Sequence, residues 1–233
     1  MRAGPAPSRA PRSVALPALA LLAGCSGPLS TLEPGGPIAA EIAWLWWAML
    51  AGAGALTLLV LVLLGLGFGP PRATRPRIWT HGLGLWFSLS VLGAVLGAGL
   101  WVGERIVPRD DGAVEVRAHA YQWGWRFSHE GPDGEAVETE GHLHIPAGAP
   151  VDVLITSSDV IHSFWVPQLA GKLDAIPGRT NRARILAGAA GDYGGVCAEF
   201  CGIGHAGMRF VVTAHADWPP APRDENGQEA GDE

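Results

Sequence analysis

A short segment near the carboxyl end gathers side chains that are suited to binding a soft metal ion. Cys197-Ala-Glu-Phe-Cys201-Gly-Ile-Gly-His205-Ala-Gly-Met208 places two thiols, an imidazole and a thioether close together in the chain. Its glycines disfavour a helix and predict a tight, irregular loop, which can aim several side chains at one point. Sulfur ligands beside imidazole select copper or zinc over magnesium or calcium.

Three interpretations of this segment follow from the residues alone. Cys197 and Cys201 could form a disulfide in an oxidising compartment, but the histidine and the methionine would then be unexplained. Zinc suits a Cys-x-x-x-Cys segment followed by His205, although zinc would have no use for Met208 and carries no electrons. Copper electron-transfer sites use His, Cys and a weak axial Met, and a second Cys permits two thiolates to bridge two copper ions.

A single-copper site needs two histidines, and a two-copper site needs one for each ion. A second histidine must therefore come from elsewhere in the chain. The best candidate is His162, which follows an expected strand in an apolar setting where a lone imidazole would lack a polar partner. A hydrogen-bonded core histidine is the alternative. His142 and His144 share a face of an expected strand and are interpreted as surface residues. The remaining histidines show no ligand pattern: His81, His119, His129 and His215.

The segments around the loop have the pattern of a β domain. Tyr121, Trp123, Trp125 and Phe127 alternate with smaller or polar residues, which predicts a half-buried strand with one aromatic face. Further strands are expected at residues 151–156, 182–186 and 208–214, with Gly- and Pro-containing turns between them. Several short strands separated by turns predict a β-sandwich or a small Greek-key barrel, here over residues 105–217.

Two stretches ahead of this domain are too apolar for a soluble surface. No charged side chain occurs over residues 42–71, and His81 is the only ionisable group over residues 78–103. A bilayer core needs about 20 apolar residues in helical form, so spans are expected at about 42–66 and 80–103. Buried helices of a soluble protein are the alternative, which the length and proximity of the two stretches disfavour.

The connection between the two spans carries basic residues and no acid: Arg72, Arg75 and Arg77. Short basic loops stay on the cytoplasmic side of a membrane. The domain that follows the second span then faces outward, into the periplasm of a bacterium. The sequence therefore predicts a multi-pass protein of the bacterial inner membrane, anchored by a helical hairpin over residues 42–104.

The first residues are typical of a bacterial lipoprotein signal peptide. Three arginines precede a modest apolar stretch, Val14–Leu22, which is too short to span a membrane. Leu22-Ala-Gly-Cys25 matches the lipobox, in which cleavage leaves a lipidated cysteine at the new N-terminus. We expect a cleaved segment over residues 1–24, lipidation of Cys25 and an outer N-terminal segment over residues 25–41. An incidental cysteine in a hydrophobic leader is the alternative.

Charge narrows the class of partner. The formal net charge is −6, which argues against nucleic acid. Five acidic residues fall within residues 130–140, a Gly- and Pro-containing stretch that is expected to be an exposed loop. Such a cluster is either ordinary solvated surface or a contact for a basic protein. Residues 218–233 begin Pro-rich and become acidic, which predicts a disordered tail.

From the first apolar span to about Ala214 the chain resembles subunit II of the haem–copper cytochrome c oxidases. The segment from Cys197 to Met208 resembles that family's dinuclear copper (CuA) motif, which is highly specific. Asp159-Val-Ile-His-Ser-Phe and Lys172-Leu-Asp-Ala-Ile-Pro-Gly-Arg resemble its neighbouring signatures, and Tyr121-Gln-Trp-Gly-Trp resembles its aromatic segment. The family implies a cupredoxin-like Greek-key domain behind a two-helix membrane hairpin.

The resemblance also implies the residues of the site. Two copper ions would be held by His162, Cys197, Cys201, His205, Met208 and the main-chain carbonyl of Glu199. The side chain of Glu199 would reach a magnesium or manganese ion at the boundary with subunit I. Trp123 matches the tryptophan at which electrons arrive from cytochrome c, whereas strand alternation alone favours a core aromatic. The acidic residues 130–140 become a candidate docking surface for basic cytochrome c.

The implied activity is a one-electron relay within an oxidoreductase. Electrons from cytochrome c would pass through the copper centre to haem in subunit I, where oxygen is reduced and protons are translocated. Subunit III is a further expected partner. No Cys-x-x-Cys-His motif for haem attachment occurs in the sequence, so the donor cytochrome is expected to be a separate protein.

Three positions depart from the family's pattern. Ala198 replaces a common serine that is not a ligand. Gly124 replaces the usual tyrosine between the two tryptophans, so the packing around Trp123 is expected to differ. Pro76-Arg77 stand before Ile-Trp-Thr, where a glutamate associated with proton uptake is frequent, which argues against proton uptake through this subunit.

Three other functions share some of these features. A quinol oxidase subunit II has the lipobox and the hairpin but has lost the copper ligands, all of which are retained here. A copper chaperone or storage lipoprotein would bind copper without relaying electrons, and the aromatic segment and Glu199 argue against it. A purely structural, disulfide-bonded domain is the third alternative.

Overall fold

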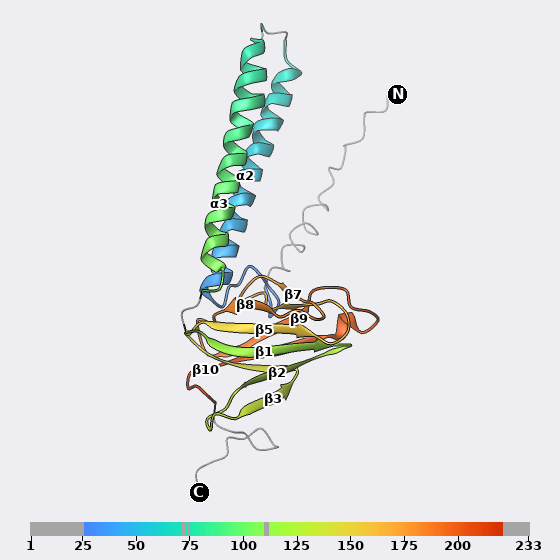
Figure 1. Cartoon of the computed structure of the whole chain (residues 1–233). Coiled ribbons are helices and arrows are strands. Elements are labelled where there is room, and N and C mark those ends of the chain that lie inside the picture. Colours follow the sequence, from blue (N-terminus) through green and yellow to red (C-terminus); the bar gives the residue numbers. More distant parts are fainter. Residues whose placement is uncertain (1–25, 71–72, 74, 110–111, 221–233) are drawn as a thin grey trace, which may run out of the picture.

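The computed structural model describes residues 26–70, 73, 75–109 and 112–220. The expected signal peptide, Cys25 and residues 221–233 of the expected tail lie outside the described residues. Within the described range, two long helices stand on a β domain (Figure 1). The predicted fold class, an apolar helical hairpin followed by an all-β cupredoxin-like sandwich, is confirmed.

The hairpin consists of helix α2, Pro37–Gly67, and a second helix that starts as the π-helical segment η2, Ile78–Phe87, and continues as α3, Ser88–Ile106. Proline at the first position of α2 is compatible with a helix start, because its missing N–H has no intrahelical role there. Both helices are long and apolar enough to cross a membrane, and none of the residues in their most apolar windows is buried. Hydrophobic side chains that cover an exposed helix on all sides require lipid or protein around them.

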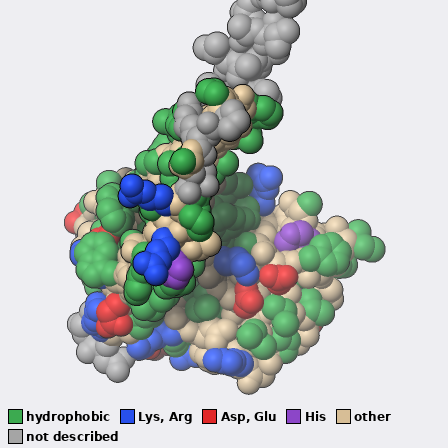
Figure 2. Space-filling model, turned by 90° about the horizontal axis from the view of Figure 1, so that it is seen from above, with side chains coloured by type: hydrophobic (Ala, Val, Ile, Leu, Met, Phe, Trp, Pro, Cys, Tyr) green, Lys and Arg blue, Asp and Glu red, His purple; other side chains and the backbone are tan. Residues whose placement is uncertain are grey.

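At the end of the hairpin that meets the β domain, polar and aromatic contacts join the two helices to each other. Arg105 near the end of α3 forms an ion pair with Glu41 of α2, with 2.9 Å between Nη2 and Oε1. The same guanidinium lies over the ring of Trp101, which packs edge-on against Trp44. Seen from above, hydrophobic side chains cover the helices, while the β domain beneath them carries both signs of charge (Figure 2).

The β domain is a sandwich of two five-stranded sheets. The first sheet has the order β3-β2-β1-β5-β8, and the second has the order β4-β10-β9-β6-β7. The strands of the first are β1 Val114–Tyr121, β2 Gly124–Glu130, β3 Ala136–Glu140, β5 Val151–Ser157 and β8 Asn181–Ile185. The strands of the second are β4 His142–Pro146, β6 His162–Trp165, β7 Leu173–Ala175, β9 Gly191–Cys197 and β10 Arg209–His215. The strands expected at 151–156, 182–186 and 208–214 are thus present, with ends that differ by one residue.

An aromatic cluster fills the space between the sheets beside the cysteine loop. Trp125 and Phe127 of β2 pack against Phe164 of β6 and Phe210 of β10, with ring centroids 5.0–6.5 Å apart. All four side chains are buried. Burying aromatic rings of this size is the main source of stability in a small sandwich.

Two sequence predictions about this region were wrong. Tyr121 and Trp123 do not share a strand with Trp125, because β1 ends at Tyr121 and a turn separates it from β2. Trp123 therefore lies in the turn, outside the buried aromatic face. The acidic residues 130–140 are exposed but do not form only a loop, since Ala136–Glu140 pairs with β2 as strand β3.

The N-terminal segment is fastened to the domain before α2 begins. The Gly35 N–H donates to the Gln168 carbonyl at 2.8 Å, and the Gly188 N–H donates to the Gly35 carbonyl at 2.8 Å. A Cβ on Gly36 would lie 1.8 Å from the Leu186 carbonyl oxygen, so only glycine permits this close approach. The start of α2 is therefore held against the domain by backbone hydrogen bonds.

Candidate metal centre

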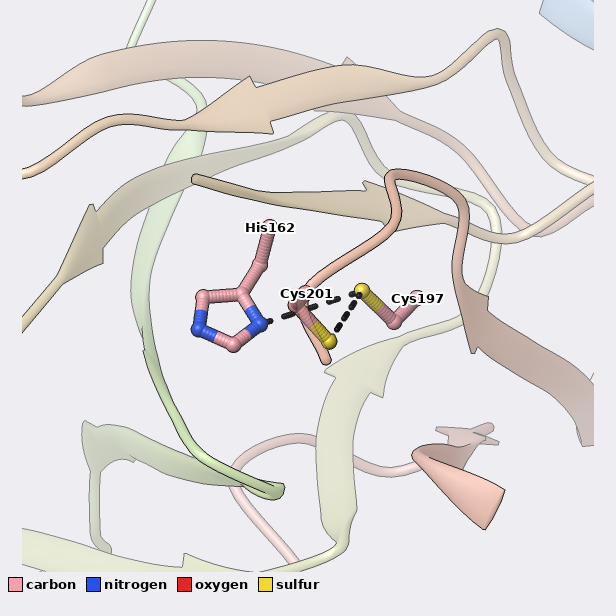
Figure 3. Close-up of side chains that lie close together, drawn as sticks. All are labelled: His162, Cys197 and Cys201. Atoms are coloured by element: carbon pink, nitrogen blue, oxygen red, sulfur yellow. Dashed lines mark hydrogen bonds between the residues drawn. The ribbon is translucent and has the colours of Figure 1, made fainter. Parts of the chain in front are cut away.

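The metal-binding side chains come from two paired strands of the second sheet and from the loop that joins β9 to β10. β6 pairs antiparallel with β9, so Phe164 lies opposite Cys197 and His162 lies two residues further along the same face. The loop after Cys197 includes the single 3-10 turn η3, His205–Gly207, before β10 begins. Figure 3 shows His162, Cys197 and Cys201 turned toward one another.

The six expected donor groups converge on the two thiols. Cys197 Sγ and Cys201 Sγ lie 3.8 Å apart. Beside Cys197 Sγ are His162 Nδ1 at 3.9 Å and the Glu199 carbonyl oxygen at 3.3 Å. Beside Cys201 Sγ are His205 Nδ1 at 3.7 Å and Met208 Sδ at 3.8 Å. Each thiol therefore has one imidazole and one weaker donor next to it.

The site is enclosed by protein. His162, Cys197, Cys201 and Met208 are all buried. Across the part of the chain that the structure describes, His162, Cys197 and Cys201 form the one group of three His, Cys or acidic side chains whose ligand atoms all lie within 4.8 Å of one another. Cysteine sulfur, imidazole and thioether together favour copper, and the residues present can hold it.

A carboxylate outside the cluster orients His162. The ring Nε2 of His162 lies 2.8 Å from Asp159 Oδ1, so Nε2–H donates to the carboxylate and the lone pair of Nδ1 faces Cys197. Burial alone would raise the pKa of Asp159, but hydrogen bonds from His162, the Val160 N–H and the Gln122 N–H lower it. An ionised carboxylate behind a histidine fixes its tautomer and increases its basicity as a ligand.

The thiol of Cys201 depends on a metal ion for its ionisation. Burial, followed by the neighbouring Cys197, raises the pKa of Cys201 to about 11. Without a bound cation this thiol is therefore protonated at neutral pH. A coordinating metal displaces the proton, because the thiolate is the form that binds metal.

Trp123 lies on the outside of the cysteine loop. Its indole Nε1–H donates to the Cys201 carbonyl at 3.2 Å, and 46% of the residue is exposed. A Cβ on Gly204 would come within 2.5 Å of Trp123 Cγ, so glycine at this position lets the indole lie against the loop. Trp123 thus reaches from solvent to the backbone of a cysteine in the metal centre.

Gln122 connects the same turn to both ligand-bearing segments. Its side-chain Nε2–H donates to the Cys201 carbonyl at 2.8 Å, and its backbone N–H donates to Asp159 Oδ2 at 2.7 Å. Tyr121 bonds to Glu140 instead, and its hydroxyl occupies the space where a Cβ on Gly124 would lie. The departure at Gly124 thus leaves room for Tyr121 to fold over the start of β2.

The carboxylate of Glu199 forms an ion pair with Lys172. Lys172 Nζ lies 3.3 Å from Glu199 Oε2 and 2.8 Å from Asp174 Oδ1. The hydrogen bond to Asp174 is the largest cause of the raised pKa of Lys172. Glu199 therefore presents its carbonyl to the thiols and its carboxylate to a charged surface cluster.

The structure brings together all the expected copper ligands and places Trp123 beside them. The two thiols are free and unbridged, so the disulfide interpretation is not what the structure has. Met208, which a zinc site would leave unused, lies at the centre. Asp159, Gln122 and Lys172 were not predicted as supporting residues. These residues are distant in sequence from the cysteines, so no local pattern indicates their contacts. The one available signal was the position of Asp159, three residues before His162 and within reach of its ring.

A correction concerns the histidines that were interpreted as surface residues or as lacking a pattern. His142 is exposed, as expected. His144 is half-buried and forms a ring cluster with His129 and His215. No local spacing could indicate this cluster, because its members come from three different strands.

A protein-family comparison matches residues 128–215 to the family described as cytochrome c oxidase subunit II, periplasmic domain. The chain is 32% identical over 162 residues to the alternative cytochrome c oxidase subunit 2 of Bradyrhizobium diazoefficiens, covering 57% of this chain and 58% of that protein. It is 38% identical over 104 residues to the cytochrome c oxidase subunit 2 of Alkalihalophilus pseudofirmus, covering 45% of this chain and 30% of the relative.

Among solved structures, the chain is similar to the periplasmic domain of subunit II of cytochrome oxidase from Bradyrhizobium japonicum. The identity is 30%, the TM-score is 0.43, and the match covers 48% of this chain and 89% of that one. The chain spans between 30% and 58% of the length of the first curated relatives that it matches.

Proposed function

Because this chain belongs to the cytochrome c oxidase subunit II family, we propose that it accepts electrons from cytochrome c at a dinuclear copper centre and passes them to haem in subunit I. The convergence of six donor groups on Cys197 and Cys201 carries this proposal. In this role the chain takes part in an oxidoreductase, while oxygen reduction and the coupled proton translocation occur in subunit I.

The donor set fits a pair of copper ions better than a single ion. Two thiols 3.8 Å apart can bridge two metals, and each thiol has its own imidazole and its own weak donor. When bound, a pair of copper ions held by these residues would supply one-electron transfer. The enclosed loop and the Asp159–His162 hydrogen bond limit movement of the ligands as charge changes, which keeps the reorganisation of the site small.

Trp123 is proposed as the residue at which electrons arrive. The support is its position, with one face in solvent and its indole N–H hydrogen-bonded to the Cys201 carbonyl. The exposed apolar side chains of Phe200 and Ile203, 76% and 98% exposed, project from the same loop. An apolar surface around the arrival point, together with the acidic residues 130–140, suits docking of basic cytochrome c; of these, Glu140 bonds to Tyr121 close to Trp123.

The remaining partners are proposed from the same family membership. Subunit I would contact the hairpin and the Glu199 face, where the carboxylate would hold a magnesium or manganese ion in place of its contact with Lys172. Subunit III completes the expected assembly. The domain would face the periplasm, with Arg75 and Arg77 in the cytoplasm and a lipid on Cys25 as a further anchor.

Metal analysis and electron paramagnetic resonance test the copper centre. The copper-loaded full chain should contain two coppers and give the hyperfine pattern of an electron shared by both. His162→Ala should lose that signal, because one imidazole and its link to Asp159 are removed. His119→Ala is the matched control, since His119 of β1 bonds to Thr156 of β5 in the first sheet, away from the expected ligands of the second sheet. One copper per chain, or zinc alone after copper loading, would contradict the dinuclear centre.

A further inference from the structure

A cluster of three imidazoles lies at the end of the sandwich away from the cysteines. His129 is near the end of β2, His144 is in β4 and His215 ends β10. β10 begins directly after Met208 and contains 7 residues. An extended strand of that length covers about 20 Å, so the histidine cluster is separate from the candidate copper centre.

The ring centroids, but not yet the ring nitrogens, have the spacing of imidazoles that share a metal ion. His144 Nδ1 and His215 Nε2 are hydrogen-bonded to each other at 2.9 Å, a bond that a metal ion would replace, and their ring centroids are 5.1 Å apart. The centroids of His129 and His144 are 5.6 Å apart. With zinc–nitrogen bonds of about 2.0–2.1 Å and tetrahedral angles, two bound imidazoles have centroids about 5 Å apart.

His129 is held in the tautomer that a metal ligand requires. Its Nδ1 lies 3.1 Å from the Glu130 carbonyl oxygen, which can only accept, so Nδ1 carries the proton. Nε2 then has a free lone pair, yet it is buried without a hydrogen-bond partner in a residue that is 5% exposed. Leaving a buried acceptor unpaired costs stability, whereas a histidine that donates its other N–H to a carbonyl is typical of metal sites.

The chemistry of the cluster selects the ion. Three imidazoles in one cluster suit a borderline divalent ion such as zinc, with an open position for water. Among the described residues, only the cysteine–histidine group has all its ligand atoms within 4.8 Å of one another, so binding here requires at least one ring to turn. His144 and His215 are only half-buried, which gives their rings room to rotate.

We propose that His129, His144 and His215 form a second metal site, which binds one zinc-type divalent ion and joins the two sheets. The ion would link β2 of the first sheet to β4 and β10 of the second, beneath Trp218, whose ring lies 5.3 Å from that of His129. An ion that binds only the folded domain raises its stability.

Zinc titration of the copper-loaded full chain in detergent tests the site. Equilibrium dialysis with elemental analysis should find one additional zinc per chain, an unchanged copper content and a higher unfolding temperature. His144→Ala and His215→Ala should each weaken zinc binding at least about tenfold, as loss of a metal-supporting group does. The matched control is His142→Ala, an exposed histidine on the same strand as His144, which should bind zinc like the parent chain.

Two results would overturn the site. One is the absence of a saturable zinc beyond the copper centre, or zinc that is bound only by displacing copper. The other is zinc binding that persists in both His144→Ala and His215→Ala. Because these two positions are half-buried, their variants are expected to fold even if a change at the buried His129 prevents folding.

Discussion

At the scale of single residues, the proposed role of Trp123 in electron arrival rests on the position of its indole ring. The indole N–H bonds to the Cys201 carbonyl, and the ring is supported by the flat surface of Gly202 and Gly204. This places a delocalised ring in contact with a cysteine backbone on one side and solvent on the other. A core aromatic would have neither an exposed face nor this bond.

The substitution Trp123→Phe distinguishes a role of Trp123 in electron arrival from a role in packing. The variant keeps an apolar ring and loses one hydrogen bond, so the free energy of unfolding should fall by about 1 kcal/mol at most. Copper spectra should persist, while the rate of reduction by cytochrome c at saturating donor should fall steeply. Stopped-flow absorbance measures that rate. Tyr121→Phe, which loses a bond to Glu140 instead, should keep the parental rate. An unchanged saturating rate in Trp123→Phe would leave Trp123 without this role.

The residue scale also shows where sequence reasoning reaches its limit. The cysteine loop could be predicted because its ligands are local, and His162 could be added because an isolated apolar imidazole needs a partner. The exposure of Trp123 could not be predicted, because alternation of residues is informative only within one strand and a turn precedes β2. Gln122 reaches the Cys201 carbonyl across 79 residues of sequence, and no spacing rule indicates such a contact.

At the scale of elements, the aromatic cluster holds the ligand-bearing segments in place. Phe164 lies two residues after His162 on β6, and Phe210 lies two residues after Met208 on β10. Both pack on Trp125 and Phe127 of β2. The cysteine loop is therefore supported from the opposite sheet, so damage to the core should reach the metal centre.

Phe127→Ala tests that support. Removing a buried phenyl ring should lower the free energy of unfolding by about 3–5 kcal/mol and reduce copper occupancy. Phe200→Ala also removes a phenyl ring, but from an exposed position in the cysteine loop. It should lower the free energy of unfolding by no more than about 0.5 kcal/mol. Thermal unfolding followed by near-ultraviolet circular dichroism, with copper analysis, compares the two. Equal losses in both variants would show that the loop does not depend on the aromatic cluster.

The elements themselves were largely predictable. Uncharged runs predicted the two helices, and short β-rich runs between turns predicted strands β5, β8 and β10. The division of the aromatic segment into β1 and β2 and the pairing of residues 136–140 as β3 were not predictable, because turn position and strand pairing depend on partners that are distant in sequence.

At the scale of the whole molecule, the two ends of the hairpin differ in charge and in attachment. One end is fixed to the β domain through Gly35 and Gly36, and the Arg105–Glu41 pair joins the two helices there. The other end carries Arg75 and Arg77 without an acid nearby in sequence. Such asymmetry orients a hairpin with its basic connection in the cytoplasm, since arginine resists translocation. In this proposed orientation, the candidate metal centre would face the compartment of the proposed donor.

Thiol labelling of two single-cysteine additions tests this orientation. Ala73→Cys adds a thiol to the basic connection and leaves its arginines in place, and Glu138→Cys adds one to the exposed strand β3. In spheroplasts, a membrane-impermeant maleimide should label Glu138→Cys at once and Ala73→Cys only after permeabilisation. The parent chain corrects for the native cysteines, of which Cys197 and Cys201 are buried. Labelling of Ala73→Cys before permeabilisation would reverse the hairpin and place the copper ligands in the cytoplasm, where the proposed donor could not reach them.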